Sequence, residues 1–519
     1  MAEPLELLGQ SLEAFRTEET QESPRVEGTG NVAAKRFSPI DRSQMMIRPV
    51  CVDKLVAEDH PVRAIWAMVS QLDMSRFEES VKVVEGGKGR SSSDPRLLAA
   101  LWIYAYSEGI NSAREIARMC IYEPGFQWLT GMKEINYHTL SDFRTWDKDA
   151  IDHMFVQVLG VLSAEGLTHL KRVMQDGTKV KAQASRNSFR REETLREHLK
   201  LAQEQVAAMG DPNSEELSQR VIKARQRAME ETKQRLERAV EELEKLEKTR
   251  KESEKAPRVS ESDPEARVMM QSDGGFAPSY NVQISTEASN KIIVAVGVTQ
   301  EGTDYNQLAD GIDRVKANMT VTPEQMVVDG GYVKNENIEK TAAQGVDLIA
   351  PVTETDSEPC LRRRGIRPEF YPDKFQYDEA ANTFTCPAGK TLPFQRTQRR
   401  KGRMEYQYRA EKADCAACPF RNQCCPKASS RWIVRQEYSE AVKAFRAKMQ
   451  TDPAKQIYRT RAEVAEFPNA WIKEKLGLRK FRLRGLRKVG LEAIWACVTY
   501  NIQQWIRITW RPKFAAAAS

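Results

Sequence analysis

The chain has 519 residues, more than one hydrophobic core usually organises, so we expect two or three domains. Its hydrophobic content of 40% and charged content of 29% are typical of a soluble globular protein, and its net charge is only +7. No apolar run approaches the roughly 20 residues of a membrane-spanning helix, and "MAEPLELLGQ" lacks the features of a signal peptide. Nine unevenly spaced cysteines argue against a secreted disulfide framework, so the cytoplasm is the expected compartment and no membrane partner is expected.

The N-terminal third is predicted to be helical. Residues 1–40 are polar and aperiodic, which predicts a disordered tail, and residues 41–170 predict a helical DNA-binding domain, with apolar residues three and four apart in "RLLAALWIYAYSEGI" and "IDHMFVQVLGVLSAEGL". Between these segments we expect a short helix after Ser112, a loop, and a helix over "HTLSDFR" whose start fits a capping box of Thr139 and Asp142. Such a pair of helices is either a helix-turn-helix or part of a small helical bundle.

The middle of the chain predicts a sheet domain, residues 171–185 and 258–352, interrupted by an arm. "KRVMQDGTKVKAQAS" predicts a strand that carries Asp176, and "SYNVQIST" and "KIIVAVGVT" predict two adjacent strands. A helix over "NQLADGIDRVKAN", a buried strand "EQMVVDGGY" ending in Asp329, a helix "NENIEKTAAQG" and a strand "VDLIAPV" follow. Residues 186–257 repeat apolar residues at helical spacing on both sides of "MGDPNSEE", which predicts two antiparallel helices that either contact DNA or form a solvated spacer.

The C-terminal part predicts an irregular cysteine-bearing segment, residues 353–435, and a helical region, residues 436–510. The helical region contains Tyr458–Lys488, which ends in a run of six cations without an acid. Its last part, "LEAIWACVTYNIQQWIRITW", predicts an amphipathic helix whose tryptophans pack in the core rather than stack on bases.

Three carboxylates from distant parts of the chain can converge if two lie on neighbouring strands and the third on a covering helix. Asp176 and Asp329 each stand beside glycine at a predicted strand end, which an ordinary turn would also explain. Carboxylates suit a hard ion such as Mg²⁺, and two such ions activate a nucleophile and stabilise the leaving oxygen of a phosphodiester. The element order strengthens this interpretation.

The third carboxylate is either Glu463 or Glu466. Arg459 and Lys473 both lie seven residues from Glu466, so Glu466 falls on a helical column between two cations. Glu463 is adequately explained as a surface partner of Arg459. We therefore choose Glu466, and Pro468 predicts a kink or restart of the helix beside it.

The segments "MQDGTKVKA", "YNVQIS", "VVDGGY" and "YRTRAEVAEFPNAWIKEKLGLRKFRLRG" resemble those of bacterial insertion-sequence transposases of the DDE class, from about Pro49 to Trp505. The most similar group has a helical N-terminal domain and a cysteine-bearing insertion before the catalytic glutamate. The resemblance implies a ribonuclease H-like catalytic domain in a mixed fold, α+β or α/β. Asp176, Asp329 and Glu466 fall on the family's catalytic, metal-binding triad, which implies Mg²⁺ or Mn²⁺.

Many relatives carry tyrosine, arginine, glutamate and lysine on the last helix, and Tyr458, Arg461, Glu466 and Lys473 match them in kind. The gap from arginine to glutamate is five here (466 − 461) instead of the commoner four, so either Arg461 or Arg459 corresponds to the family's arginine. The expected DNA-binding residues are Tyr458, Arg459, Arg461, Lys473, Arg479, Lys480, Arg482, Arg484, Arg487 and Lys488.

The resemblance implies a nucleoid-associated enzyme that cleaves the ends of an insertion sequence and joins the 3′-hydroxyl ends to target DNA by two-metal phosphoryl transfer. Its partners would be double-stranded DNA, at the terminal inverted repeats and the target, and a second copy in a homodimer. The alternatives are an inactive or repurposed DNA-binding relative and a general nuclease that cuts without joining.

The cysteine-bearing segment suggests a structural Zn²⁺ site. Cys415 and Cys418 have the spacing of a zinc knuckle, and Cys386 precedes a tight-turn sequence. Cys424 is the expected fourth ligand, with Cys425 as its competitor. Reduced cysteines without a metal are the alternative.

Overall fold

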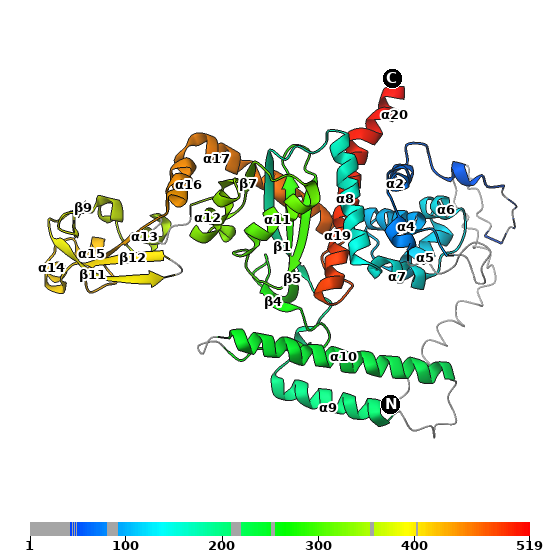
Figure 1. Cartoon of the computed structure of the whole chain (residues 1–519), viewed down its shortest axis with the longest axis horizontal. Helices are drawn as coiled ribbons and strands as arrows, with labels where there is room; N and C mark the ends of the chain where they lie inside the picture. Colours follow the sequence, from blue (N-terminus) through cyan, green and yellow to red (C-terminus); the bar gives the residue numbers. More distant parts are fainter. Residues whose placement is uncertain are drawn as a thin grey trace, which may run out of the picture. The chain divides into compact units, whose positions relative to one another are not determined.

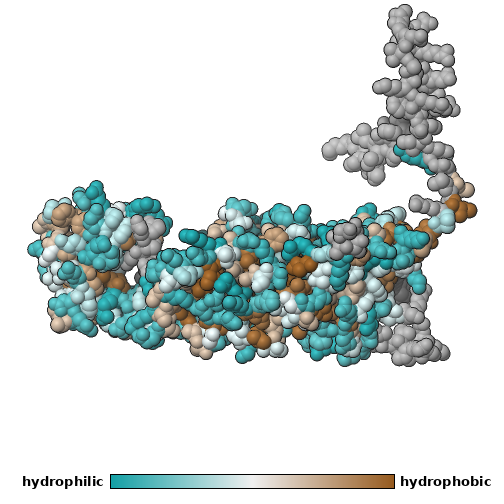
Figure 2. Space-filling view, turned by 90° about the horizontal axis from the view of Figure 1, so that it is seen from above, coloured by the Kyte–Doolittle hydropathy of each residue, from teal (hydrophilic) through white to brown (hydrophobic). Residues whose placement is uncertain are grey.

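The computed structural model describes residues 42–43, 45, 47, 49–79, 92–208, 219–250, 255–352, 358–400 and 403–518. The predicted tail, residues 1–40, lies outside them. The chain divides into two units, Met1–Val50 and Cys51–Ser519, and the description below concerns the second. None of its described helices is long and apolar enough to cross a membrane, and the face seen in Figure 2 is mostly hydrophilic, with hydrophobic residues in small groups.

The N-terminal region is helical, as predicted. Its elements are η1 (Val52–Leu55), α2 (Pro61–Ser70), α3 (Ser75–Glu78), α4 (Pro95–Ser107), α5 (Ala113–Tyr122), α6 (Pro124–Thr130), α7 (Tyr137–Thr145) and α8 (Lys148–Ala164). The expected loop after α5 is wrong, because Pro124 begins a further helix, α6. The expected capping box of Thr139 and Asp142 is also wrong, because α7 starts earlier and the Asn136 side chain accepts the N–H of His138.

The predicted strands and one strand that was not predicted, β4, form one mixed sheet. Its strands are β1 (Arg172–Lys181), β4 (Arg267–Met270), β5 (Phe276–Glu287), β6 (Ile293–Thr299), β7 (Gln325–Val327) and β8 (Asp347–Ile349). β5 pairs antiparallel with β1 along one edge and with β4 and then β6 along the other, whereas β1, β7 and β8 are mutually parallel. The predicted helices α11 (Gln307–Met319) and α12 (Asn335–Ala343) and the short η3 (Gly330–Tyr332) complete this part of the fold.

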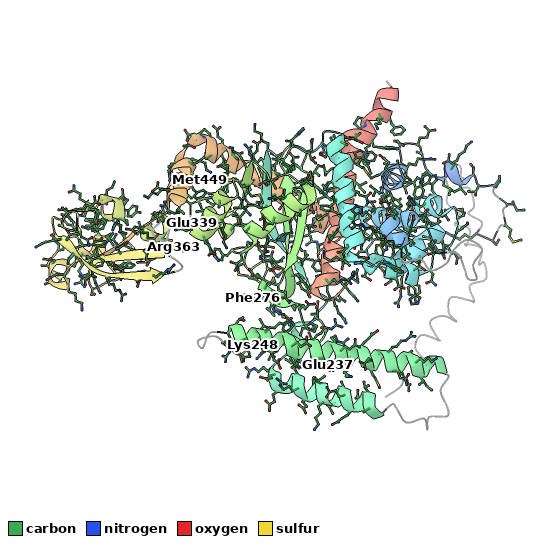
Figure 3. All side chains as sticks on the ribbon, viewed as in Figure 1. Glu237, Lys248, Phe276, Glu339, Arg363 and Met449 are labelled. Atoms are coloured by element: carbon green, nitrogen blue, oxygen red, sulfur yellow. The ribbon has the colours of Figure 1, made fainter. Side chains whose placement is uncertain are left out.

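The arm between β1 and β4 consists of two antiparallel helices, as predicted. Its elements are η2 (Arg186–Ser188), β2 (Phe189–Arg190), α9 (Glu192–Ala208), α10 (Gln219–Thr249) and β3 (Val259–Ser260). The two helices lie side by side in Figure 1, and Figure 3 labels Glu237 and Lys248 on α10. Arg196, near the start of α9, pairs with Glu244, near the end of α10. The helices share a hydrophobic core of their own, and β2 pairs with β3 at the base of the arm.

The cysteine-bearing segment is not irregular, which corrects the expectation. It contains α13 (Glu358–Arg363), η4 (Pro368–Phe370), η5 (Pro372–Lys374), β9 (Gln376–Asp378), β10 (Thr383–Thr385), β11 (Thr391–Arg400), β12 (Arg403–Arg409), α14 (Lys412–Ala416), α15 (Arg421–Cys424) and β13 (Trp432–Gln436). The strands form a five-stranded sheet in the order β13-β12-β11-β10-β9. This segment also buries its own core, in which Leu392 and Tyr408 are fully enclosed.

The C-terminal region returns to helices. They are α16 (Glu440–Gln450), α17 (Asp452–Arg459), the π-helical turn η6 (Ala462–Glu466), α18 (Phe467–Glu474), α19 (Leu486–Trp505), the π-helical turn η7 (Ile506–Trp510) and α20 (Arg511–Ala518). The predicted restart at Pro468 is confirmed, since α18 begins at Phe467 directly after the π turn. Helix α16 packs on α12 (Figure 3 labels Met449 and Glu339 on them), where Ser439 donates a hydrogen bond to Glu339.

From Val489 onward, helix α19 is buried on all sides rather than amphipathic, which corrects the prediction for this segment. It contacts α4, α8 and β6, so it joins the N-terminal helices and the sheet in one hydrophobic core. Trp495 is fully buried, and its indole N–H donates to the carbonyl of Arg144. The core role predicted for the tryptophans is confirmed for Trp495 and Trp505.

Replacement of Glu492 by glutamine should destabilise the fold by about 3 kcal/mol, because it leaves the buried Arg144 guanidinium without its counter-charge. Glu492 is fully buried on α19, and its Oε1 lies 2.6 Å from Arg144 Nη2. Urea unfolding measures the change. Arg118→Gln, which removes an exposed ion pair within α5, is the control and should change the free energy of unfolding little. Equal effects of the two variants would contradict the role given to Glu492.

Candidate active site

Asp176 and Asp329 lie at the same level of the sheet. Met174 of β1 is the register partner of Val327 of β7, and the two strands are parallel. Asp176 and Asp329 each lie two residues further along the chain, so they lie beside each other. Asp329 lies two residues after the end of β7 and accepts the N–H of Gly331 at 2.7 Å. Asp176 stands inside β1 rather than at a strand end, so the turn that the sequence also allowed at this position is wrong.

Glu466 reaches the same place from the C-terminal helices through Arg461. The Arg461 guanidinium lies between two carboxylates, with Nη1 3.4 Å from Asp176 Oδ1 and Nη2 3.8 Å from Glu466 Oε1. Only 14% of the Arg461 side chain is exposed, against 62% for Glu466. Arg461 therefore connects the strand carboxylate with the helix carboxylate, whereas Arg459 is exposed.

The unusual spacing of five between Arg461 and Glu466 has a local structural cause. The intervening residues form the π-helical turn η6, Ala462–Glu466. A π turn bonds residue i to residue i+5, which inserts one residue into a regular helix. Residues five apart therefore lie on the same face of this turn, whereas in an α-helix residues four apart do so.

Glu463 points to a different partner. Its carboxylate accepts a hydrogen bond from Lys291 Nζ at 2.8 Å, and its side chain is 75% exposed. The predicted pairing of Glu463 with Arg459 is therefore wrong. The geometry separates the two glutamates, since only Glu466 is joined through Arg461 to Asp176.

A further carboxylate, Asp304, was missed from the sequence. It lies in the loop between β6 and α11, and its Oδ1 accepts hydrogen bonds from Asn281 Nδ2 at 2.7 Å and Gln283 Nε2 at 2.6 Å. A Cβ on Gly177 would stand 2.3 Å from this oxygen, so glycine after Asp176 is what allows Asp304 to approach β1. The glycine of "QDG" was a signal of this close approach, but the sequence did not show what approaches.

Asn469 was missed as well. It is 8% exposed, and its Nδ2 donates to Asp176 Oδ2 at 3.0 Å. The Oδ1 of the same amide is buried without a hydrogen-bond partner among the described residues. Asn469 lies three residues after Glu466, so the helical spacing that selected Glu466 could have pointed to it.

The electrostatics of the cluster disfavour its charged form. The pKa of Asp176 is raised to about 6, chiefly by burial; the Arg461 guanidinium opposes the rise, and the carboxylates of Asp329 and Asp304 contribute to it. Burial also lowers the pKa of the Lys473 ammonium, which lies near Asp176. A bound cation would relieve the repulsion among these carboxylates.

The contacts of the carboxylates bear on whether the cluster can hold a divalent metal ion. No group of three His, Cys, Asp or Glu within the described ranges is arranged to hold a metal ion as it stands. The donor types nevertheless fit a hard cation, because carboxylate oxygens converge beside a buried amide oxygen that has no partner. The Arg461 guanidinium stands between two of those carboxylates, so a metal ion at this position would have to share or take over its contacts.

The predicted basic run is partly engaged by the protein itself. Arg479 pairs with Glu474, the Arg482 side chain donates to Asn111 Oδ1 at 3.0 Å, and the Arg484 side chain donates to the carbonyl of Gln183 at 3.3 Å. Lys480, Arg487 and Lys488 are exposed. Tyr458 lies close to Arg461, beside the carboxylates.

The cysteines predicted to bind zinc are brought together. Cys386, Cys415, Cys418 and Cys424 line one cavity of about 30 Å³, together with Cys425. Burial raises the pKa of the Cys424 thiol to about 12, and the neighbouring thiols add to the rise. The donor types fit a thiolate-binding metal, although the four do not form a metal site as they stand.

Comparisons with known proteins identify the family. The family described as "Transposase DDE domain" matches residues 385–506, and the "Transposase domain (DUF772)" matches residues 50–146. The chain belongs to the DDE transposases of insertion sequences. The first match includes Glu466 but neither Asp176 nor Asp329 of this DNA transposase. The second match covers its N-terminal helices as far as α7.

Among solved structures, the transposase is similar to a piggyBac transposase in a synaptic complex with hairpin DNA. The identity is 8%, the match covers 86% of this chain and 74% of that one, and the TM-score is 0.32. None of the curated proteins matches the chain.

The metal-free transposase should become more stable at neutral pH when Asp176 is replaced by asparagine. The pKa of Asp176 is about 6 in the folded protein and about 4 in an unfolded chain. The folded state is therefore favoured below about pH 4 and loses this advantage as the pH rises through about 6. Asparagine cannot ionise, so the variant should gain about 2 kcal/mol over the wild type near pH 7.5.

Chemical unfolding with a chelator, at about pH 4 and pH 7.5, measures this difference. Asp59→Asn, at an exposed aspartate, is the matched control and should show no pH-dependent gain. A variant of Asp176 that loses stability equally at both pH values would show that the carboxylate is not repelled in the folded state.

Proposed function

We propose that this DNA transposase cleaves the ends of an insertion sequence and joins the 3′-hydroxyl ends to target DNA, on a ribonuclease H-like catalytic domain. The observation that carries the proposal is the convergence of three chain segments, β1 with Asp176, the end of β7 with Asp329 and η6 with Glu466. The mixed sheet, in which an antiparallel set is followed by parallel strands and flanked by helices, supports the assignment of the fold.

Divalent ions such as Mg²⁺ or Mn²⁺, held by Asp176, Asp329 and Glu466, would supply activation of the attacking oxygen and stabilisation of the leaving oxygen. The surrounding residues hold this set in place. Asn469 fixes one oxygen of Asp176, and Arg461 spans Asp176 and Glu466. Asp304 adds negative charge close to Asp176 and takes its own orientation from Asn281 and Gln283.

The DNA partner is double-stranded DNA at the terminal inverted repeats and at the target site. Support comes from the exposed cations Lys480, Arg487 and Lys488, which lie beyond the carboxylate cluster in the chain and attract phosphates. Lys473 lies near Asp176 and would contact a phosphate at the cluster itself. Because two DNA ends must be paired for joining, we propose a homodimer as the active form.

Glu466→Gln should abolish strand cleavage and joining while DNA binding persists. The test uses duplexes that carry the flanking element ends, with Mg²⁺ present, and measures cleaved and joined products separately. The expected loss is at least roughly 100-fold, the scale of removing one charged group from a catalytic centre. Glu463→Gln is the matched control, because it removes a carboxylate of the same helical segment that pairs with Lys291 instead, and it should retain activity.

Each alternative has its own result in this assay. Equal joining by the wild type and Glu466→Gln would exclude Glu466 as the third ligand. Cleavage without joined products would indicate a general nuclease. Tight binding to the element ends without cleavage by the wild type would indicate a DNA-binding relative that has lost catalysis.

We also propose a structural Zn²⁺ held by Cys386, Cys415, Cys418 and either Cys424 or Cys425. The support is that all five thiols line one cavity inside a segment with a small core. Elemental analysis of the purified protein should find one zinc per chain. Cys418→Ser should lose it, whereas Cys51→Ser, at an exposed cysteine elsewhere, should keep it. A folded wild type without zinc would contradict the site. If only one of Cys424→Ser and Cys425→Ser loses zinc, the cysteine replaced in that variant is the fourth ligand.

A further inference from the structure

A second cavity lies away from the carboxylate cluster. It has a volume of about 580 Å³ and is lined by residues of α8, β6, α11 and the start of α19. β6 is separated from β1, the strand of Asp176, by the whole width of β5. The charged residues in its wall are Lys148, Asp152, Glu265, Arg314 and Arg487.

Arg314 is the unusual residue of this wall. No carboxylate in the described part of the chain forms an ion pair with it, and its Nη2 is buried without a hydrogen-bond partner there. Asp310 and Asp313, on the same helix, act on it only at longer range. A guanidinium stays charged in a protein and presents several donors. Since Arg314 lines the cavity and no described carboxylate neutralises it, its guanidinium is suited to an anion that the protein does not itself supply.

The backbone beneath Arg314 leaves room for the guanidinium. A Cβ on Gly297 would stand 2.2 Å from Arg314 Nη1 and 2.6 Å from its Cζ, so only glycine at this position of β6 lets the side chain lie across the strand. Since Gly297 itself lines the cavity, the arrangement of Arg314 and the open space beside it depend on the same residue.

The other charges of the wall are unequally engaged. Lys148 forms an ion pair with Asp152, and Glu265 accepts the N–H of Leu486 at the start of α19. Arg487 is exposed and forms no ion pair with any described residue. Two cations, Arg314 and Arg487, are therefore left without a carboxylate partner around one cavity, whereas both acids of the wall already have a contact.

We propose that this cavity binds a phosphate group, with Arg314 donating to its oxygens and Arg487 adding charge at the exposed side. Paired guanidinium donors match the oxygens of a phosphate in geometry and charge. The phosphate comes either from the DNA backbone or from a free phosphate. Because Arg487 belongs to the basic run that the proposed function assigns to DNA, the DNA backbone is the source we favour, and this choice rests on the proposed function.

The test compares Arg314→Gln with Lys316→Gln, a matched loss of one exposed cation two residues away on α11. Binding of the full-length protein to an element-end duplex is measured by fluorescence anisotropy over a series of salt concentrations. Loss of one phosphate contact should lower the slope of log affinity against log salt by about one in Arg314→Gln and leave it unchanged in Lys316→Gln. Gly297→Ala, which displaces the guanidinium without removing its charge, should act like Arg314→Gln.

A second arm identifies the source without relying on DNA. The melting temperature of each protein is measured with inorganic phosphate and with an equal ionic strength of chloride. The cavity would be assigned to a free phosphate if two results are found together. Phosphate stabilises the wild type but not Arg314→Gln, and the slope of log DNA affinity against log salt is the same in both proteins. If neither measurement distinguishes Arg314→Gln from Lys316→Gln, the proposed site is wrong. If the protein does not cleave DNA, the proposed function is wrong, but the binding and melting measurements still test the phosphate site.

Discussion

The buried ion pair of Glu492 and Arg144 is the contact on which the arrangement of the fold depends. Glu492 is on α19, Arg144 is on α7, and both lie where the N-terminal helices meet the helix that supports the sheet. The same carboxylate accepts the backbone N–H groups of Arg482 and Leu483 at 3.0–3.1 Å. One carboxylate therefore holds both α7 and the nearby Arg482–Leu483 segment against α19, and its burial is tolerable because each of its oxygens has a charged or hydrogen-bonding partner.

That contact also determines where the basic run lies. Once Arg482 and Leu483 are held by Glu492, the preceding residues run beside β1, where the N–H of Phe481 donates to the carbonyl of Lys181 and the N–H of Lys181 donates to that of Arg479. The strand that carries Asp176 is thus bonded directly to the segment that carries the cations. In the proposed function, DNA bound to those cations would lie beside the strand that carries Asp176.

Much of the fold was predictable from the sequence because it depends on local periodicity. The alternation in β5 and β6 and the helical spacing in α4, α8, α11 and the arm were sufficient to identify those elements. The cysteine-bearing segment was read as irregular, since its strands mix arginine, glutamine and threonine and bury a small core, so their pattern lacks a clear apolar face. The cap of α7 was misplaced because Asn136 and Thr139 are both good capping residues, and the local sequence does not choose between them.

The site was predictable only where a motif marks it. Asp176 and Asp329 precede glycines, and Glu466 stands among cations, whereas Asp304 carries no signal of its own and Asn469 has only its helical spacing from Glu466. Their roles arise from contacts made across the chain, such as that of Asn469 with Asp176. The partner of Glu463 was predicted wrongly for the same reason. Lys291 lies in the turn between β5 and β6, so helical spacing could not reveal its contact with Glu463.

The charged side chains around β1 are arranged so that cations from the C-terminal helices offset the repulsion among carboxylates of the sheet region. Asp176, Asp329 and Asp304 are held close enough to raise the pKa of Asp176, which is unfavourable for the folded chain by itself. Arg461 and Lys473 offset part of that repulsion, and both come from the C-terminal helices rather than from the sheet. The π turn is what lets Arg461 contact Asp176 while Glu466 remains mostly exposed. A cluster arranged in this way favours binding of further positive charge, and its glutamate is mostly exposed to solvent.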